Sequence, residues 1–385
     1  MSIPQNLYRT LALIVIAQFC CTSLWFAGNA IVLDLVETFD LPSDALGYLT
    51  SSVQLGFIVG TLLFALLSLS DRYSPAKLFL VSALLGAGTN LLIIIPDNTF
   101  ASLLGIRFAT GFFLAGIYPV GMKIASDYFT KGLGLALGYL VGALVLGTAF
   151  PHLLSGLGWS LDWQAVIAGT SLLAAIGGLL IGLWVGDGPD RVPGETLDPS
   201  AFFHVFRNPE FKAAAIGYFG HMWELYAFWA FVPVMLSQSL DPGSDISLLT
   251  FGIIAIGAVS CVLGGIMSKK LGVKQVAQSS LVISGICCLL SPIMLQSSPN
   301  LIVFFLLVWG FFVIADSPMF STLVASSAPA AKKGSALTIV NSIGFAITII
   351  SIQLLNLLSS YSFGYAILAI GPIIGIWAIR RVKFS

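Results

Sequence analysis

The stretch Gly111-Phe-Phe-Leu-Ala-Gly-Ile-Tyr-Pro119 has a counterpart 199 residues later, Gly310-Phe-Phe-Val-Ile-Ala-Asp-Ser-Pro318. Both stretches begin with Gly-Phe-Phe and end with proline. Trp25 and Trp223 match at nearly the same offset, which is about half of the 385 residues. Repeated matches at one offset indicate that the chain consists of two related halves.

Apolar side chains dominate both halves. Hydrophobic residues make up 57% and charged residues 9% of the chain, and the mean hydropathy is +0.98. Because soluble domains carry about 25% charged residues, this composition excludes a soluble protein. The apolar runs are continuous, which favours helices over the alternating strands of a membrane barrel. We expect twelve membrane-spanning helices, near residues 9–33, 45–69, 76–95, 99–122, 132–153, 163–185, 211–238, 247–268, 275–296, 300–324, 335–358 and 362–380.

These features predict an all-α membrane protein in which twelve transmembrane helices form two pseudo-symmetric six-helix bundles. The longest polar stretch, which contains Asp187-Gly-Pro-Asp-Arg-Val-Pro-Gly-Glu195, follows the sixth span. It predicts a linker at 187–210 between an N-terminal bundle at 1–186 and a C-terminal bundle at 211–385. Apolar chains with internal repeats are typical of secondary transporters.

Charged residues separate between the two sides of the predicted membrane. Threading the spans alternately places the following basic residues on one side: Arg9, Arg72, Lys77, Lys123, Lys131, Arg191, Arg207, Lys212, Lys269, Lys270, Lys274, Lys332, Lys333, Arg380, Arg381 and Lys383. The opposite loops carry the acids Asp34, Glu37, Asp40, Asp44, Asp97, Asp162, Asp241 and Asp245. By the positive-inside rule, the basic side and both termini are cytoplasmic. The first span is too long for a signal peptide, so we expect no cleaved leader. We expect an integral protein of a bacterial inner membrane.

Three motifs resemble those of the major facilitator superfamily. The loop Ser70-Asp-Arg-Tyr-Ser-Pro-Ala-Lys77 is similar to the family's cytoplasmic Asp-Arg loop, although Leu67 and Ser74 stand where glycines are usual. The stretch Arg107-Phe-Ala-Thr-Gly111 is similar to the family's arginine motif in the fourth span. A third pattern partly resembles an antiporter motif in the fifth span: Gly138, Gly147 and Pro151. The resemblance covers essentially the whole chain and implies rocker-switch alternating access, with a substrate site between the halves.

Four ionisable side chains lie well inside the predicted spans: Arg107, His221, Glu224 and Asp316. Such a group near the bilayer centre costs about 2.5–3.5 kcal/mol and needs a partner or a function. Arg107 either binds an anionic group or tunes a proton-coupling carboxylate, or it pairs with a polar neighbour or a backbone carbonyl. The family resemblance implies a role for Arg107 in proton coupling.

His221 and Glu224 are three residues apart and share one face of the seventh helix. A carboxyl and an imidazole at membrane depth could exchange protons near neutral pH, so we expect this pair to carry the coupled proton. Alternatively, His221 bonds to a neighbouring helix and Arg107 neutralises Glu224. Asp316 precedes Pro318, which should bend the tenth helix; Asp316 is either a second protonation site or a cap of the broken turn.

Metal binding is a weaker interpretation. His221, Glu224 and Asp316 could form a divalent-metal site, but no ligand spacing enforces it. Cys20 and Cys21 are adjacent, so their side chains diverge by about 100° on a helix. We therefore expect neither a metal site nor a cofactor.

The Asp-Arg loop suggests a cytoplasmic gate. In the family this loop latches the two halves, and here Asp71 and Arg72 have Asp127 as the available partner. The counterpart in the second half, Lys269-Lys270, lacks the acid, so we expect only one latch. Simple positive-inside anchoring is enough to explain these two lysines.

Uncharged residues complete the candidate substrate site. Polar and aromatic side chains inside spans face protein or a cavity rather than lipid. The substrate-binding candidates are Arg107, Trp25, Asn29, Gln54, Trp223, Tyr226 and Asn341, and Gln18 and Trp229 are further candidates.

Together, these observations predict a proton-coupled secondary transporter of a small polar or anionic solute. A multidrug/proton antiporter is the main alternative, and a nontransporting sensor is a more distant one. We expect no enzyme activity, because no nucleophile or metal constellation is visible. The expected partners are a small-molecule substrate, protons and the lipid bilayer, with no nucleic acid, and we expect a monomer.

Overall fold

A computed structural model describes residues 5–129, 133–157, 162–191, 205–241, 243–328, 333–358 and 363–382. The chain divides into two compact units, Met1–Thr196 and Leu197–Ser385. The predicted linker at 187–210 lies partly outside the described residues, so its limits stay a prediction. Lys131, Lys332 and Lys383 also lie outside them.

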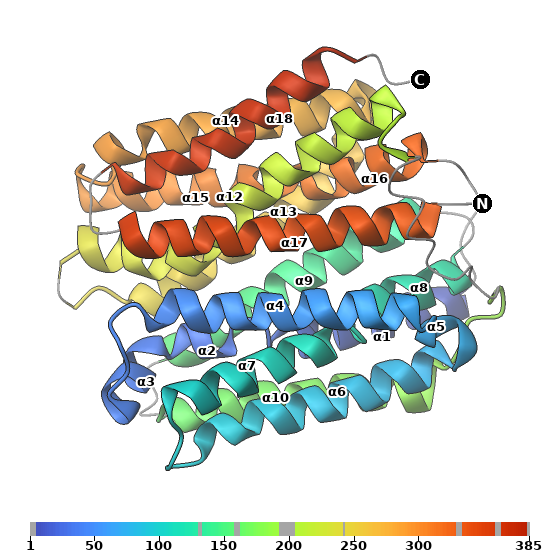
Figure 1. The fold of residues 1–385 in the computed structure, drawn as a ribbon, viewed down its shortest axis with the longest axis horizontal. Coiled ribbons are helices and arrows are strands. Elements are labelled where there is room, and N and C mark those ends of the chain that lie inside the picture. The colour runs from blue at the N-terminus through green and yellow to red at the C-terminus, as the bar shows by residue number, and fades with distance from the viewer. Residues whose placement is uncertain are drawn as a thin grey trace. The chain divides into compact units, whose positions relative to one another are not determined.

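The first unit is a bundle of helices that run lengthwise beside one another (Figure 1). Its helices are α1 (Gln5–Thr22), α2 (Ala27–Ala30), α3 (Val32–Phe39), α4 (Ala45–Leu66), α5 (Leu69–Arg72), α6 (Pro75–Leu91), η1 (Leu92–Ile94), α7 (Phe100–Leu114), α8 (Tyr118–Tyr128), α9 (Leu133–Gly156), α10 (Trp163–Leu180) and the π-helical turn η2 (Ile181–Val185). Helix α1 packs against α9 and α10, and α4 packs against α7.

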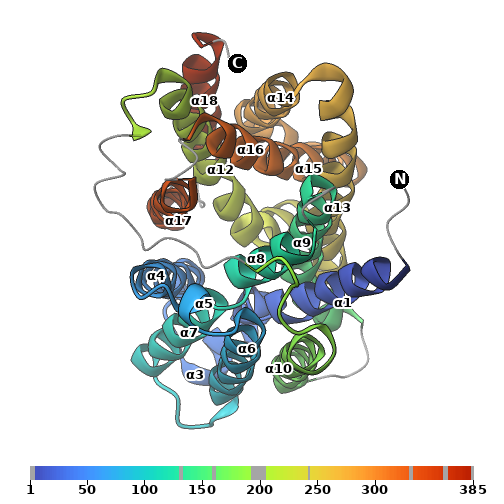
Figure 2. The same cartoon turned by 90° about the vertical axis from the view of Figure 1, so that its right-hand side faces the viewer.

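The second unit is built in the same way. Its helices are α12 (Pro209–Ser239), α13 (Ile246–Leu271), α14 (Val273–Met294), α15 (Pro299–Ala315), α16 (Ser317–Ser327), α17 (Lys333–Leu358), η4 (Gly364–Ala369) and α18 (Ile370–Arg380). Helix α12 packs against α17 and α18, and α13 packs against α15. Seen along the helices, the members of each bundle lie side by side (Figure 2).

The described helices cover the predicted spans. Nine helical stretches are long and apolar enough to cross a membrane, and two shorter apolar helices lie at Leu7–Thr22 and Gly364–Arg380. Helix α12, which has 31 residues and carries His221 and Glu224, covers the predicted seventh span. No strand occurs within the described ranges. The predicted all-α membrane fold is confirmed.

Three of the predicted spans are interrupted. The span at 9–33 ends its first helix at Thr22, resumes as α2 and continues as α3. The fourth span breaks between α7 and α8, and the tenth between α15 and α16, each just before a proline in the first turn of the next helix. The bend expected at Pro318 is therefore confirmed, and Pro119 lies at the matching break of the fourth span. The break in the first span was not predicted.

The repeated Gly-Phe-Phe stretches have a packing explanation. A Cβ on Gly111 of α7 would overlap the carbonyl oxygen of Val53 on α4, and a Cβ on Gly310 of α15 would overlap that of Ile253 on α13. Only glycine lets these helix backbones approach so closely. The same contact therefore holds two helices together in each unit.

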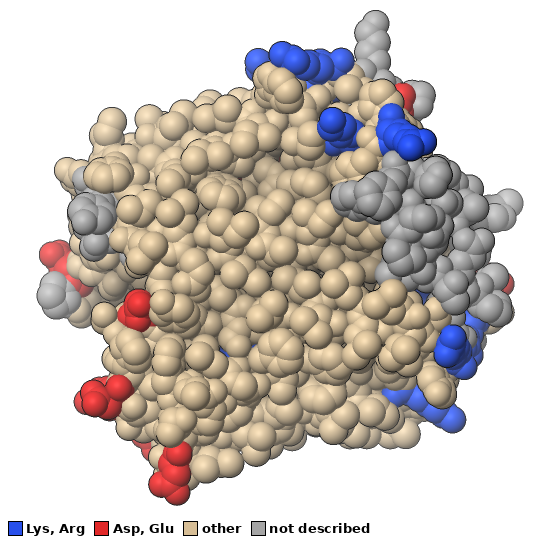
Figure 3. All heavy atoms as spheres, viewed as in Figure 1, with Lys and Arg blue, Asp and Glu red and all other residues tan. Residues whose placement is uncertain are grey.

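Charged side chains lie mainly at the helix ends. In Figure 3 the visible acidic and basic side chains lie mostly at the ends of the helices, with uncharged residues between them. The helix ends agree with this view: Arg72 ends α5, Lys269 and Lys270 lie in the last turn of α13, and Arg380 ends α18. The apolar surface between the charged ends fits contact with lipid.

Candidate functional site

Helix α12 carries the ionisable residues of the second unit. Its N-terminus is well formed, because the Asn208 side chain accepts a hydrogen bond from the Glu210 N–H (2.9 Å) and Pro209 occupies the first turn. Along most of its length the helix is buried within the chain. His221 and Glu224 are each 1% exposed, as expected for two residues on one inward face.

His221 meets Asp316 at the break between α15 and α16. The Nδ1 atom of His221 lies 2.7 Å from Oδ1 of Asp316, and both side chains are 1% exposed. The two atoms are close enough for an ion pair, but their geometry does not meet the angle required for a hydrogen bond. The Asp316 side chain forms no helix cap. The Asp316 carboxyl therefore contacts the imidazole of His221, and other groups bond to the backbone of the broken turn.

The backbone at this break is satisfied by a neighbouring helix. Pro318 cannot donate to the carbonyl of Ile314, four residues earlier. That oxygen instead accepts from the Asp316 N–H and lies 3.8 Å from the Cys261 thiol of α13. The proline thus creates the turn that points Asp316 inward.

Glu224 sits in a cage of three donors. Its Oε1 accepts from Nε1 of Trp309 on α15 (2.7 Å) and from Sγ of Cys288 on α14 (3.3 Å). Its Oε2 accepts from Oγ of Ser284 on α14 (2.9 Å). All three donors are buried. Sequence reasoning did not select any of them; the only hint is that Trp309 directly precedes the repeated Gly310.

These contacts contain no fixed positive charge. Within the described part of the chain, neither Glu224 nor Asp316 lies within ion-pair distance of a lysine or arginine. No group of three His, Cys, Asp or Glu residues among the described residues is arranged to hold a metal ion. The site therefore consists of two carboxyl groups, one imidazole and uncharged donors.

Arg107 occupies a different setting in the first unit. It lies on α7 and is 1% exposed. Its guanidinium donates to the backbone carbonyl of Leu24 (3.1 Å) and to that of Trp25. Both carbonyls belong to the break between α1 and α2, where helical partners are missing. Its Nε has no hydrogen-bond partner among the described residues and lies beside Gly28.

The other predicted substrate residues of the first unit are buried. Asn29 donates to the hydroxyl of Thr50 (2.8 Å), and the ring of Trp25 packs on Phe57 with centroids 4.8 Å apart. The amide of Gln54 has no hydrogen-bond partner in the described part of the chain, and the same holds for Gln18.

Those of the second unit lie on α12 and α17. Trp223 donates through Nε1 to the carbonyl of Ile367 (3.3 Å). The ring of Tyr226 packs against Trp229 and Phe345, at 5.3 and 5.2 Å between centroids. Asn341 is half-buried on α17. Whether a solute reaches these residues stays a prediction.

Asp187 and Arg191, which sequence reasoning missed, hold the loop of the predicted cytoplasmic gate by hydrogen bonds and an ion pair. Oδ1 of Asp187 accepts from the Ser74 hydroxyl (2.8 Å) and from the Ala76 N–H (3.0 Å) at the start of α6. Arg191 pairs with Asp187 (3.3 Å) and donates to the carbonyl of Tyr73 (2.7 Å). No short-range sequence signal links residues more than 100 positions apart.

The three predicted gate residues have other settings. Arg72 is exposed, and no ion pair between Arg72 and Asp127 is found in the described part of the chain. Asp127 is buried, and its carbonyl accepts from the Asp190 N–H (3.1 Å). Asp71 belongs to α5, but its side chain lies outside the described residues. The latch role of this group stays a prediction.

Comparison with known proteins places this arrangement in a family. The model of the Major Facilitator Superfamily matches residues 13–352. The chain belongs to the Major Facilitator Superfamily. Members of this family are transporters, so both the predicted resemblance and the assignment to transport rather than to an enzyme class are supported.

Two curated relatives of this facilitator chain match about half of it. The Uncharacterized transporter YgaY of Escherichia coli O157:H7 is 29% identical over 182 residues, which cover 46% of this chain and 44% of YgaY. The Agnestins efflux protein AgnL12 of Paecilomyces divaricatus is 26% identical over 231 residues, covering 57% of this chain and 51% of AgnL12. The chain spans about half the length of the curated relatives it matches.

Solved structures share the facilitator fold. A bacterial homolog of the human lysosomal transporter Spinster, inward-facing and unoccupied, has a TM-score of 0.71 at 15% identity and covers 98% of this chain and 94% of that one. Its inward-facing, occupied form gives 0.69 at 16% identity, with the same coverage. At these identities the likeness concerns the fold alone.

Proposed function

We propose that this facilitator is a proton-coupled secondary transporter of a small polar or anionic solute, working by alternating access. Glu224 and the His221–Asp316 pair bind the coupled protons. The observation that carries the proposal is that, among the described residues of the second unit, two fully buried carboxyl groups meet only an imidazole and uncharged donors. Because no lysine or arginine in the described part of the second unit lies within ion-pair distance, binding a proton is the direct way to neutralise such a carboxylate at membrane depth.

The cage around Glu224 supports both charge states. Three donors point at the carboxyl, which suits the ionised form. Ser284 Oγ also lies 3.3 Å from the carbonyl of Leu281. After proton uptake, Glu224 can donate to Ser284 Oγ while Ser284 donates to Leu281. The proton is accommodated by a rotating hydroxyl, with no movement of heavy atoms.

Unpartnered polar groups in the first unit support a polar or anionic solute. The buried amides of Gln18 and Gln54 and the Nε–H of Arg107 have no hydrogen-bond partner among the described residues. Buried polar groups without partners are uncommon, and a bound solute or water is the usual explanation. Arg107 would add a permanent positive charge beside that solute.

The test uses proteoliposomes with a trapped pH-sensitive dye. Amino acids, carboxylates, sugar phosphates and ethidium are first screened by thermal shift of the purified protein at two pH values. A solute that stabilises the protein is then added to the proteoliposomes. Glu224→Gln should abolish uptake driven by a pH gradient, a loss of ~100-fold or more, but leave counterflow exchange measurable. Ser284→Ala should slow driven uptake less severely.

Glu37→Gln is the matched control, because Glu37 is an exposed carboxylate near the end of α3. It should behave like the unmodified protein. Driven uptake at an unchanged rate in Glu224→Gln would show that Glu224 carries no proton. Uptake that ignores the pH gradient in the unmodified protein would refute proton coupling altogether.

Drug efflux coupled to protons is the second candidate. It is favoured by the efflux protein AgnL12 among the relatives and by the partial antiporter motif at Gly138, Gly147 and Pro151. Expression in a drug-sensitive host distinguishes the two. Resistance to several unrelated cationic compounds, lost in Glu224→Gln, would favour efflux, and unchanged sensitivity would exclude it.

A further inference from the structure

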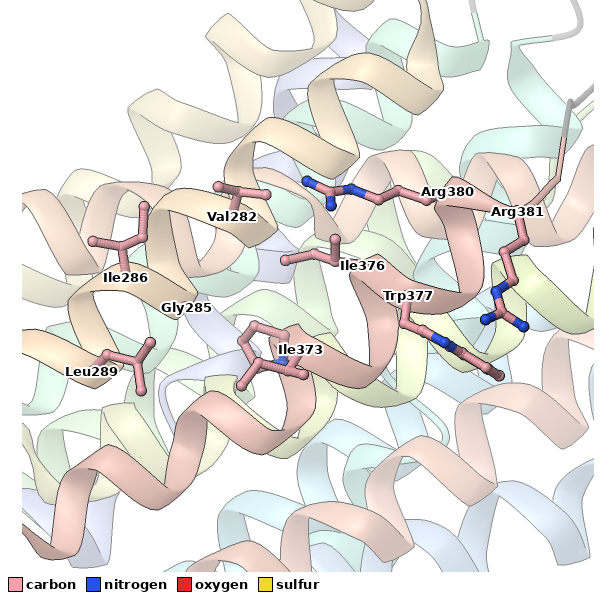
Figure 4. A pocket seen from close by; sticks show the side chains of 10 residues that line it. Val282, Gly285, Ile286, Leu289, Ile373, Ile376, Trp377, Arg380 and Arg381 are labelled. Atoms are coloured by element: carbon pink, nitrogen blue, oxygen red, sulfur yellow. The ribbon is translucent and has the colours of Figure 1, made fainter.

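A groove runs along the outside of the second unit between α14 and α18. Its volume is about 460 Å³. Figure 4 shows Ile286, Leu289 and Ile373 towards one end and Trp377 and Arg381 towards the other, and the Arg380 side chain extends back along the groove towards Val282. The groove belongs to neither the proton site nor the predicted substrate residues.

The groove owes its depth to a glycine. A Cβ on Gly285 would lie 2.8 Å from Cβ of Pro372, so α14 and α18 touch there without an intervening side chain. On either side of this contact, Ile286, Leu289 and Ile373 are 49%, 56% and 55% exposed. An apolar channel this open, on the flank of a membrane span, fits an acyl chain better than a polar solute.

The other end of the groove is strongly basic. The guanidinium carbon of Arg381 lies 4.1 Å from the ring centroid of Trp377, a cation–π contact that fixes its direction. Lys274, at the start of α14, donates to the carbonyl of Val382 (2.6 Å) and closes this end. Neither Arg380 nor Arg381 forms an ion pair with a carboxylate among the described residues. The groove is therefore bordered by two arginines that have no carboxylate partner in the described part of the chain.

We propose that this groove is a binding site for one anionic phospholipid of the membrane leaflet at the basic ends of the helices. The phosphate lies between Arg380 and Arg381, and one acyl chain lies along Ile286, Leu289 and Ile373. Basic pockets between transmembrane helices recognise anionic headgroups, and each nearby arginine strengthens the attraction. Tryptophan at the same level suits the headgroup region.

The site also adjoins the proton site through a shared helix. Helix α14 carries Gly285, Ile286 and Leu289 in the groove and Ser284 and Cys288 in the Glu224 cage. A lipid that holds α14 against α18 therefore supports the helix that supplies two of the three donors. This connection follows from the helix alone and does not depend on the transported solute.

The experiment measures lipid binding to the whole purified protein after delipidation, by native mass spectrometry. Phosphatidylglycerol is titrated against phosphatidylcholine with the same acyl chains. The Arg380→Gln/Arg381→Gln variant should bind phosphatidylglycerol about thirtyfold more weakly, which corresponds to ~1 kcal/mol per arginine. Val282→Phe, which fills the groove but keeps both arginines, should also reduce binding.

Matched controls decide the outcome. Lys269→Gln/Lys270→Gln removes two charges from the same end of α13, and Val259→Phe enlarges an exposed residue of α13; neither position lines the groove. Both should leave binding unchanged. An equal loss in the lysine variant, or equal binding of phosphatidylcholine, would overturn the proposal. So would saturation by glycerol phosphate alone, which indicates a free-anion site, or a lipid-insensitive dimer, which indicates a second copy in the groove.

Discussion

The two units hold the first helix of each half by opposite means. In the first unit this helix is broken after Thr22, and Arg107 donates to backbone carbonyls at the break. In the second unit α12 is continuous, and side chains of α14, α15 and the turn before α16 hold it through Glu224 and His221. One unit uses a cation on backbone oxygens, and the other uses acids on side-chain partners.

Because of this difference, the contacts that hold α12 can change with pH, whereas those of Arg107 cannot. A guanidinium keeps its charge in proteins, and a backbone carbonyl has none to lose, so the Arg107 contact is independent of pH. Carboxyl and imidazole groups exchange protons, so the contacts of α12 can respond to pH. The scaffold beneath both is the same, as the contacts of Gly111 and Gly310 show. We infer that residues shared by the two halves hold the helices together, and that residues which differ between them supply the ionisable groups.

Arg107→Gln should have the largest effect on stability. It removes two charge-assisted hydrogen bonds and leaves the carbonyls of Leu24 and Trp25 buried without donors, which costs about 3 kcal/mol or more. The buried cysteines allow each unit to be followed separately with a thiol-reactive dye: Cys20 and Cys21 report on the first unit, and Cys261, Cys287 and Cys288 on the second. Serine replacement of the other set isolates each signal.

The loss should appear first at Cys20 and Cys21. Arg9→Gln, at an exposed position near the start of α1, serves as the control and should change neither signal. Arg107→Lys keeps the charge but loses the two-pronged geometry, so it should recover only part of the stability. If Arg107→Gln unfolds like the unmodified protein, the carbonyl contact does not hold the broken helix and the comparison fails.

Gly111→Ala and Gly310→Ala should have the next largest effect. Each new Cβ would overlap a carbonyl oxygen of the adjacent helix, and forced overpacking costs about 2 kcal/mol. Because the two contacts are equivalent, the two variants should lose similar stability, each in its own unit. This experiment tests the shared part of the comparison.

Gly105 and Gly252 supply the controls. They lie on α7 and α13, and an added Cβ would meet nothing within 4 Å. Alanine there should leave stability unchanged or raise it by about 0.5–1 kcal/mol, because alanine favours a helix more than glycine does. A loss at only one of Gly111 and Gly310 would show that the repeat no longer imposes the same packing in both units.

The fold could be predicted from the sequence because the signals for it are continuous along the chain: long apolar runs and single prolines. Continuous apolar runs marked the spans, and Pro119 and Pro318 marked the bends of the fourth and tenth spans. The break after Thr22 escaped notice because no proline or charged residue accompanies it. Arg107 on α7 donates to the opened carbonyls, and such a long-range contact leaves no local pattern.

The candidate site could be predicted in part for the same reason. Scarcity identified His221, Glu224 and Asp316, since a buried ionisable group in an apolar chain stands out. Their partners Trp309, Ser284 and Cys288 do not stand out, because tryptophan, serine and cysteine are ordinary in membrane helices. Only the crossing of α12 with α14 and α15 distinguishes them.

Asp187→Asn tests the smallest difference between the units. Asp187 places a carboxylate at the N-terminus of α6, where it accepts from Ser74 and Ala76, whereas α14 begins after Gly272 with no side-chain cap. A negative charge at a helix N-terminus contributes about 0.5–1 kcal/mol. The variant should therefore lower the stability reported by Cys20 and Cys21 by that amount and leave the second unit unchanged.

Two controls test whether the loss of stability in Asp187→Asn comes from the charge at the helix N-terminus: high ionic strength and the variant Asp190→Asn. The difference between Asp187→Asn and the unmodified protein should shrink at high ionic strength, because exposed charges are screened. Asp190→Asn removes the same charge three residues later, from an exposed side chain that caps none of the described helices. Equal losses in the two variants would assign the effect to net charge in the loop, and the two units would then differ in their buried contacts alone.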